Sequence, residues 1–588
     1  MNVIDQNLEF YNLNGATSLA TILALELPPF RTAGEVFHQL NYLVDYVRRS
    51  DITANGPDRS IAVEAHYIDR DFMEDHSVFY SRNLSPTPNH CRRVHFFAGP
   101  EDQVSAELTS LARSAYSLPL HDPKSESEHA ERCKHFSGRR YLGFTVIRPL
   151  RGSPVGRTVL RTLGREKKSD ASLRVMACTR EYQVHLLGAE LTVRGLAFQQ
   201  QDVGVSACAT IALWSALHRV RETEDIASAT PAQITGLASK FRLPYGRSMP
   251  SEGLDVEQMC LAVQAIGVSP YLSRVEKFPG ARSLLYSATR SGMPAILIIE
   301  QAPDCNVKQP SPVGNESPNT ENASQERAPG PTGSESSKDD DVTEPIARRG
   351  GSAAWHAVTV VGMKLKDHHV LCPVSAGLSK AAGDDVSGDL KALYIHDDRI
   401  GPYLRAELAE AKNGDTQLSI SPEPHKVGAK PEVWNVRKIL IPQHAKIRVT
   451  FADLRALTRD HLIPEAQAVV AQQIGTQNLA DLPSIAFEHW IQPGHGYMRR
   501  VLNEGLLDEE SAIEFCRVFA MPRYIAVIRL TSERFGQMDI LLDTTSPRRN
   551  VQFLGVVAND DGSEGALRVR VAQYLAAKCD CPYYFDRE

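Results

Sequence analysis

A polar segment between Ala302 and Ser352 separates two short apolar runs in the middle of this 588-residue chain. It includes PSPVGNESPNTENASQERAPGPTGSESSKDDD and has almost no large apolar side chains. Such a segment buries too little apolar surface to offset the entropy lost on ordering, so we expect it to be disordered. The flanking runs MPAILIIE (293–300) and WHAVTVVG (355–362) have the length and composition of buried strands. The segment is therefore predicted to be a surface insertion between two strands of one domain.

The pattern on either side of this insertion predicts an α+β, multidomain protein. A length of 588 residues suggests three to four domains of ordinary size. Residues 1–165 mix a helical pattern with strand-like runs such as RRVHFFAG and are predicted to form an N-terminal α+β domain of unknown role. Residues 166–415 are predicted to form the central domain, with its insertion at 302–352. Residues 416–588 alternate between strand-like and helical patterns and are predicted to form a C-terminal α+β domain.

Composition narrows the class of protein. A hydrophobic content of 42% and a charged content of 23% are typical of a soluble globular chain. The net charge of -6 gives no broad cationic field, so we expect no nucleic-acid partner. The ten cysteines are scattered, which is typical of reduced thiols. The N-terminus MNVIDQNLEF has no signal-peptide pattern, and the chain has no run of about 18 apolar residues. We therefore expect a cytoplasmic protein that does not enter membranes.

The stretch FQQQDVGVSACATIALWSAL (198–217) contains a candidate nucleophile. Cys208 lies where the turn-forming DVGVSA gives way to an apolar helical run. A helix N-terminus and an adjacent imidazolium both favour the reactive thiolate form of a cysteine. A lone cysteine at a helix start is usually a small core residue, so the assignment depends on finding a base elsewhere in the chain.

The candidate base and its partner follow in the expected order. His356 begins the predicted strand HAVTVVG, where a rigid sheet can hold the ring. In ALYIHDDRIGPY, Asp397 and Asp398 end a strand and enter a turn, and either could orient the imidazole. Side chains alternate along a strand, and Asp397 shares the more apolar face with Leu393 and Ile395. We therefore predict that Asp397 accepts the imidazole N–H and that Asp398 caps the turn.

Acyl transfer also requires donors for the oxyanion. A glutamine side chain just before the cysteine can act together with the Cys208 backbone N–H. The sequence offers Gln199, Gln200 and Gln201.

The central region resembles the papain-like cysteine peptidases, especially the bacterial branch related to bacteriocin-processing peptidases. The shared pattern is a glutamine shortly before an AC dipeptide that opens a helix, a middle helix in SEGLDVEQMCLAVQAIG, a histidine in an HAVTVVG strand, and an acid after the next strand. It covers about residues 199–403. The resemblance implies a papain-like fold in which Cys208 is the nucleophile, His356 the general base, Asp397 the orienting acid and Gln201 the oxyanion glutamine.

One position departs from this family's pattern. The family's glutamine usually lies six residues before the cysteine, where this chain has Asp202, and Gln201 lies seven before. A one-residue bulge permitted by Gly204 would restore the spacing.

These observations predict a papain-like thiol hydrolase that cleaves a peptide or isopeptide bond of a protein or peptide substrate through a cysteine thioester. Two alternatives remain open: acyl transfer to an amine from the same thioester, and a catalytically degenerate scaffold with the same fold. No cofactor or metal is expected. The stretch HYIDRDFMEDH (66–76) is rich in histidine and carboxylates, but its spacing fits no standard ligand set. We therefore expect it to be a charged, exposed element.

The insertion leads to a first test. Replacing Pro310–Thr343 with a short Gly/Ser loop should change the free energy of unfolding by at most about 1–2 kcal/mol, because loop-closure entropy varies slowly with length. Urea unfolding of the two proteins measures the difference. If the shortened chain failed to fold, the segment would have to pack against the domain.

Overall fold

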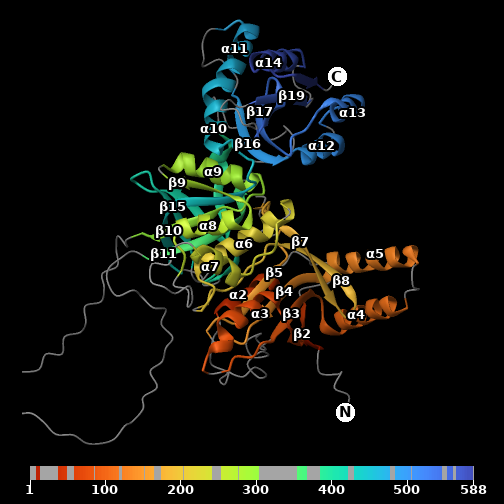
Figure 1. Ribbon diagram of the computed structural model, residues 1–588. Helices are drawn as coiled ribbons and strands as arrows, with labels where there is room; N and C mark the ends of the chain where they lie inside the picture. Colours follow the sequence, from red (N-terminus) through yellow and green to blue (C-terminus); the bar gives the residue numbers. More distant parts are fainter. Residues whose placement is uncertain are drawn as a thin grey trace, which may run out of the picture.

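The computed structural model shows an α+β, multidomain protein in which three groups of elements follow one another along the chain (Figure 1). The structure describes residues 8–13, 38–49, 58–84, 86–117, 122–150, 152–163, 174–202, 204–224, 226–240, 253–275, 277–302, 354–366, 385–421, 429–476, 482, 484–504, 506–545, 552–559 and 565–586.

The N-terminal group is built on a five-stranded antiparallel sheet whose strands lie in sequence order. They are β1 (Leu8–Asn12), β2 (Arg59–Tyr67), β3 (Cys91–Ala98), β4 (Tyr141–Ile147) and β5 (Val155–Leu160). Its helices are α2 (His38–Arg48), α3 (Arg70–Val78), α4 (Glu101–Tyr116) and α5 (Pro123–Arg140), with the short 3-10 turn η1 (Tyr80–Arg82).

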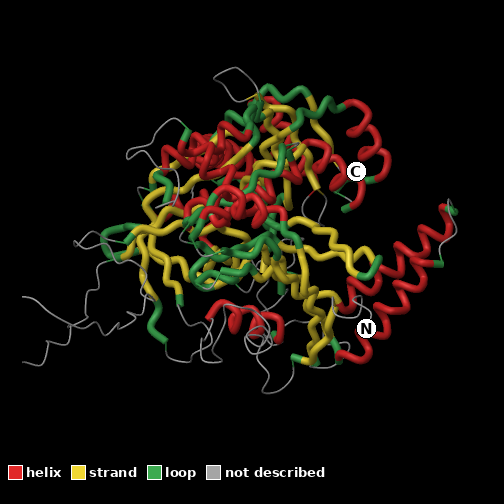
Figure 2. Tube along the Cα trace, turned by 60° about the horizontal axis from the view of Figure 1, so that its bottom comes forward, coloured by secondary structure: helices red, strands yellow, loops and turns green. Residues whose placement is uncertain are grey.

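A hairpin from the next part of the sequence packs on this group. It consists of β7 (Arg180–Leu186) and β8 (Ala189–Gly195), and β8 contacts α4, α5 and β5. Together with α4 and α5 it forms an arm that extends from the rest of the molecule (Figure 2). The apolar side chains of this hairpin belong to the same buried cluster as those of β3, β4 and α4.

The central group is an antiparallel barrel. Strands β10 (Ile296–Gln301), β11 (Trp355–Leu365), β12 (Leu390–Asp397), β13 (Gly401–Glu410), β14 (Thr416–Ile420) and β15 (Glu432–Gln443) pair in that order, and β15 pairs again with β10. Two edge strands are added, β9 (Ser269–Arg274) on β15 and β6 (Arg174–Val175) on β11. Strands β10 and β11 are adjacent, which confirms that the insertion joins two strands of one domain. The insertion itself lies outside the described residues.

In the described part of the central group, four helices accompany the barrel. They are α6 (Cys208–Thr223), α7 (Pro231–Ser239), α8 (Val256–Ile266) and α9 (Phe278–Arg290), and the 3-10 turn η2 (Val386–Asp389) precedes β12. Helix α8 has the predicted ends: Asp255 caps its N-terminus in a capping box, and Gly267 ends it in the left-handed conformation with φ 101°. Helix α6 packs against β10, β11 and β15.

The C-terminal group has a second five-stranded sheet in sequence order: β16 (Ala486–Pro493), β17 (Tyr524–Ser532), β18 (Gly536–Asp543), β19 (Gln552–Asn559) and β20 (Tyr583–Asp586). Strands β19 and β20 are parallel and are joined through α14 (Gly565–Lys578), while the other pairs are antiparallel. The remaining helices are α10 (Phe451–Leu457), the π-helical turn η3 (Thr458–Leu462), α11 (Ile463–Ile474), α12 (Gly494–Asn503) and α13 (Glu509–Val518).

The acid-rich stretch at residues 66–76 differs from the sequence expectation. Asp69 caps the N-terminus of α3, and Asp71, Phe72 and Asp75 are buried. The expectation of an exposed element was wrong for these acids, because α3 turns one face toward α7 of the central group, where Asp75 accepts a hydrogen bond from the backbone N–H of Ala232.

Throughout the described ranges, none of the helices combines the length and the apolar character that crossing a membrane requires.

Candidate active site

Helix α6 presents the candidate nucleophile. It begins at Cys208, as predicted, and Ala207 precedes it as an N-cap without a side-chain hydrogen bond. Ten of the helix's side chains are buried, whereas Cys208 itself is half-buried. The apolar run that follows Cys208 therefore fixes the helix in the interior, while the thiol is left at its partly accessible end.

The loop before Cys208 is organised by Asp202. Its Oδ1 accepts hydrogen bonds from the backbone N–H groups of Gly204, Val205 and Ser206 at 2.9, 2.8 and 3.1 Å. Burial alone would raise the pKa of Asp202, but the charge of Arg148 and these amide hydrogen bonds hold that pKa below its usual value. Asp202 thus has a structural role at the place where the resembling family has its glutamine.

The three glutamines before Cys208 differ in burial and in hydrogen bonding. Gln199 is buried, and its Nε2 has no hydrogen-bond partner among the described residues. Gln200 is buried as well, and its Oε1 accepts a hydrogen bond from the backbone N–H of Val155 at 3.2 Å. Gln201 is half-buried. The amide of Gln200 is thus engaged with the N-terminal sheet, and Gln201 is the more accessible candidate for an oxyanion donor.

The histidine and both acids meet at one end of the barrel. His356 lies near the start of β11 and is 6% exposed. Its Nε2 lies 3.1 Å from Asp397 Oδ1 and 3.4 Å from Asp398 Oδ1. A hydrogen bond with the side chain of Cys208 is among the contacts that stabilise the protonated ring. Since Nε2 faces the carboxylates, Nδ1 is the nitrogen left for the thiol.

Asp397 does more than contact the histidine. Its Oδ1 accepts hydrogen bonds from the backbone N–H and the Nε of Arg399 at 3.0 and 3.1 Å, and its Oδ2 accepts one from Arg399 Nη2 at 2.7 Å. Asp397 therefore caps the turn that follows β12. The sequence prediction gave this capping role to Asp398 and was wrong: the Asp397 side chain accepts from the N–H two residues later, whereas neither oxygen of Asp398 has a hydrogen-bond partner among the described residues.

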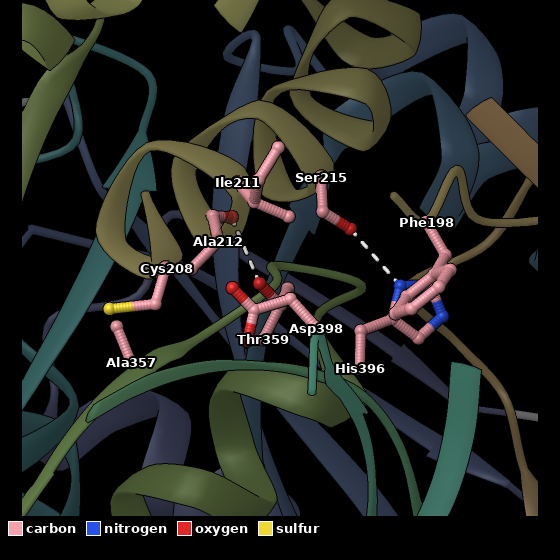
Figure 3. A pocket seen from close by; sticks show the side chains of 9 residues that line it. All are labelled: Phe198, Cys208, Ile211, Ala212, Ser215, Ala357, Thr359, His396 and Asp398. Carbon is pink, nitrogen blue, oxygen red and sulfur yellow. Dashed lines mark hydrogen bonds between the residues drawn. The ribbon is translucent and has the colours of Figure 1, made fainter. Parts of the chain in front are cut away.

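Asp398 is buried beside the histidine without a hydrogen bond. It is 3% exposed, and neither of its oxygens has a hydrogen-bond partner among the described residues. It lines a small pocket together with Cys208, Ala357 and Thr359, and its carboxyl group points into that pocket (Figure 3).

The electrostatics distinguish the two acids. Burial raises the pKa of Asp398, and the charge of Asp397 adds to this effect; the opposing charges of His356 and Arg399 leave the pKa at about 7. For Asp397, His356 and Arg399 outweigh burial and hold the pKa well below its usual range. Burial lowers the pKa of His356, but both carboxylates outweigh burial and raise that pKa to about 10.

His396 is a second histidine near Cys208, and no sequence pattern singled it out. His396 lines the same pocket as Cys208, and its Nδ1 lies 3.2 Å from Ser215 Oγ. Ser215 donates its proton to the carbonyl oxygen of Ala197 at 2.7 Å, so the ring of His396 must donate from Nδ1. Burial lowers the pKa of His396 to about 3, which makes it a neutral, structural histidine.

Trp434 covers the histidine from β15. Its ring lies 6.0 Å from that of His356, and the guanidinium of Arg399 lies 4.9 Å from the Trp434 ring centroid. Nothing local in the sequence marks this contact, since Trp434 lies far from His356 along the chain.

His356, Asp397 and Asp398 also have the donor types and the mutual distances of a metal site. Asp397 Oδ1, however, already accepts hydrogen bonds from His356 and from two donors of Arg399. Arg399 also supplies the positive charge that a cation would supply. The residues fit a hydrogen-bonded acid–base cluster better than a metal site.

In comparisons with known proteins, no family model matches this sequence and no curated protein matches it.

The titration of His356 leads to a prediction. Its pKa is raised from the ordinary 6.5 to about 10, so its contribution to stability is full below about pH 6.5 and is lost as the pH rises through about 10. The stability advantage of the wild type over His356→Gln should therefore shrink by a few kcal/mol across that window. Urea unfolding of both proteins at a series of pH values measures it. If the difference in unfolding free energy between the two proteins did not change with pH, the ion pair between His356 and the two carboxylates would be contradicted.

Proposed function

We propose that this protein is a papain-like thiol hydrolase that cleaves a peptide or isopeptide bond in a protein or peptide substrate. The observation that carries the proposal is that His356 hydrogen-bonds to the side chains of both Cys208 and Asp397. The three residues come from a helix start and two barrel strands far apart in sequence. A cysteine with a solely structural role needs no buried imidazole held by carboxylates beside it.

The accessible end of the site supports the same proposal. Of the side chains of Cys208, His356 and Asp397, only that of Cys208 is more than slightly exposed. A substrate can therefore reach the sulfur while the histidine and the acid stay shielded from water. Cys–His sites of this kind activate the thiol by transferring its proton to the imidazole.

The reaction begins when the Cys208 thiolate attacks the substrate carbonyl carbon. The negative charge moves to the carbonyl oxygen, where the Cys208 backbone N–H and the Gln201 side chain can donate hydrogen bonds. As the tetrahedral intermediate collapses, His356 gives its proton to the leaving amine, and an acyl thioester remains. Water then attacks the thioester and gives a proton to His356, which releases the carboxylic acid and restores the thiolate–imidazolium pair.

Asp397 keeps the ring in its working orientation. Its hydrogen bond to Nε2 directs Nδ1 toward the sulfur, and the hydrogen bonds from Arg399 fix the carboxylate itself.

The nucleophile is tested by Cys208→Ala, with Cys260→Ala as the matched control. Cys260 is another half-buried cysteine on a helix of the central group, with its pKa raised by burial. Mass spectrometry with peptide and ubiquitin-like electrophilic probes should show one adduct on Cys208 that disappears only in Cys208→Ala. Hydrolysis of p-nitrophenyl acetate should disappear with it. Equal modification of both variants, or an unreactive Cys208 in the wild type, would favour a non-catalytic scaffold.

The two acids give a second test of the same site. Asp397→Ala should lower kcat by about 100-fold or more, because the ring loses the group that fixes its tautomer. Asp398→Ala is the matched control at nearly the same distance from Nε2, and it should lower kcat by less than about tenfold because it removes no hydrogen bond. Steady-state kinetics with p-nitrophenyl acetate decides between them. A larger loss in Asp398→Ala would reverse the assignment.

A further inference from the structure

Arg148 connects the N-terminal group to the loop that precedes the nucleophile. It follows directly after β4, and its side chain is 1% exposed. Nη1 contacts Asp202 Oδ2 at 3.0 Å, while Nη2 donates to the carbonyl oxygens of Ser153 and Gln200 at 2.8 and 2.9 Å. The guanidinium of Arg148 thus binds both the Asp202 carboxylate and the backbone of Gln200, which lies two residues before Asp202.

The Asp202 carboxylate in turn holds the loop that precedes Cys208. Asp202 Oδ2 contacts Arg148, while Oδ1 accepts the three backbone N–H groups described above. The loop closes on itself through a hydrogen bond of 2.9 Å from the Asp202 N–H to the Ser206 carbonyl oxygen. Ala207 and Cys208 come next, so the orientation of the Cys208 N–H depends on the path of this loop.

The N-terminal group also restricts the loop by close packing. A Cβ atom at Gly204 would lie 2.6 Å from ring atoms of Phe79 and 3.0 Å from the hydroxyl oxygen of Tyr80. Tyr80 also hydrogen-bonds to the carboxylate of Asp202. The loop is therefore held between its own aspartate and side chains from a different part of the chain.

We propose that Arg148 is a positioning residue that sets the Cys208 backbone N–H for oxyanion binding by holding Asp202 in its ionised, loop-capping orientation. The inference rests on the proposed function and adds a residue from outside the region that resembles the papain-like family. Without Arg148, the buried carboxylate of Asp202 would lose the guanidinium that offsets its charge, which favours protonation of the carboxylate or its rotation away from the loop. Either change weakens its hold on the amides that precede Cys208.

The experiment compares two reactions of the same thiol. Hydrolysis of p-nitrophenyl acetate develops an oxyanion, whereas alkylation by iodoacetamide does not. Arg148→Met should therefore lower kcat for hydrolysis by about 100-fold, with KM and the alkylation rate of Cys208 changed by less than about threefold. Arg148→Lys keeps the positive charge but lacks the several N–H donors of the guanidinium, so its kcat should lie between those of the wild type and Arg148→Met.

Arg140→Met is the matched control. Arg140 is another buried arginine of the N-terminal group, paired with Glu107 at 2.6 Å and with the Ala98 carbonyl oxygen at 3.1 Å. Its loss should lower stability but leave kcat unchanged. If Arg148→Met does not fold, Asp202→Asn replaces it, with the same expected separation of hydrolysis from alkylation.

The outcomes separate the two proposals. A wild-type protein without Cys208-dependent hydrolysis would overturn the proposed function. If hydrolysis depends on Cys208 but Arg148→Met retains kcat, or if hydrolysis and alkylation fall together, only the role of Arg148 is overturned.

Discussion

The anchoring of helix α6 is the constraint on which the site depends, because the helix is held at both ends by other parts of the chain. At its N-terminus the preceding loop is fixed through Asp202 by the N-terminal group. At its C-terminus Glu224 is 6% exposed and accepts hydrogen bonds from Arg523 at 3.1 Å and from the Tyr524 hydroxyl of the C-terminal group. The Arg148–Asp202 pair is buried, and breaking such a pair by removing one partner costs about 3–5 kcal/mol, so this anchor restricts the helix strongly. The pair of Glu224 with Arg523 contributes less, because the Arg523 side chain is largely exposed. The position of Cys208 is thus determined by all three groups.

The charges around His356 explain why one of two adjacent acids differs so much from the other. A buried imidazolium needs a carboxylate, and Asp397 fills that role because Arg399 stabilises its charge in turn. Asp398 lies beside an acid that is already ionised and has no hydrogen-bond donor of its own among the described residues. Two like charges so close together cannot both be favourable in a buried site. Asp398 is therefore the group whose charge changes near neutral pH.

Local patterns predicted the parts of the fold and the site that depend on neighbours in sequence. The apolar runs around the insertion, the helix start at Cys208 and the capped ends of α8 were all readable, because each depends on a few adjacent residues. The contact between Arg148 and Asp202 was not, since nothing local marks two residues 54 positions apart as partners. The exposure expected for Asp71 and Asp75 was wrong for the same reason. Their burial follows from how α3 docks on another group.

The N-terminal group contacts the backbone on two sides of the candidate site. It holds the loop before Cys208, and its helix α2 also holds the turn that carries the acids. Gln39 Nε2 donates to the Arg399 carbonyl oxygen and the Tyr42 hydroxyl donates to the Pro402 carbonyl oxygen, both at 2.7 Å. The Tyr42 ring leaves no room for a side chain at position 401, where a Cβ atom would lie 2.3 Å from it. Because the same group fixes the backbone before the nucleophile and after the acids, a displacement of this group would change both sides of the site together.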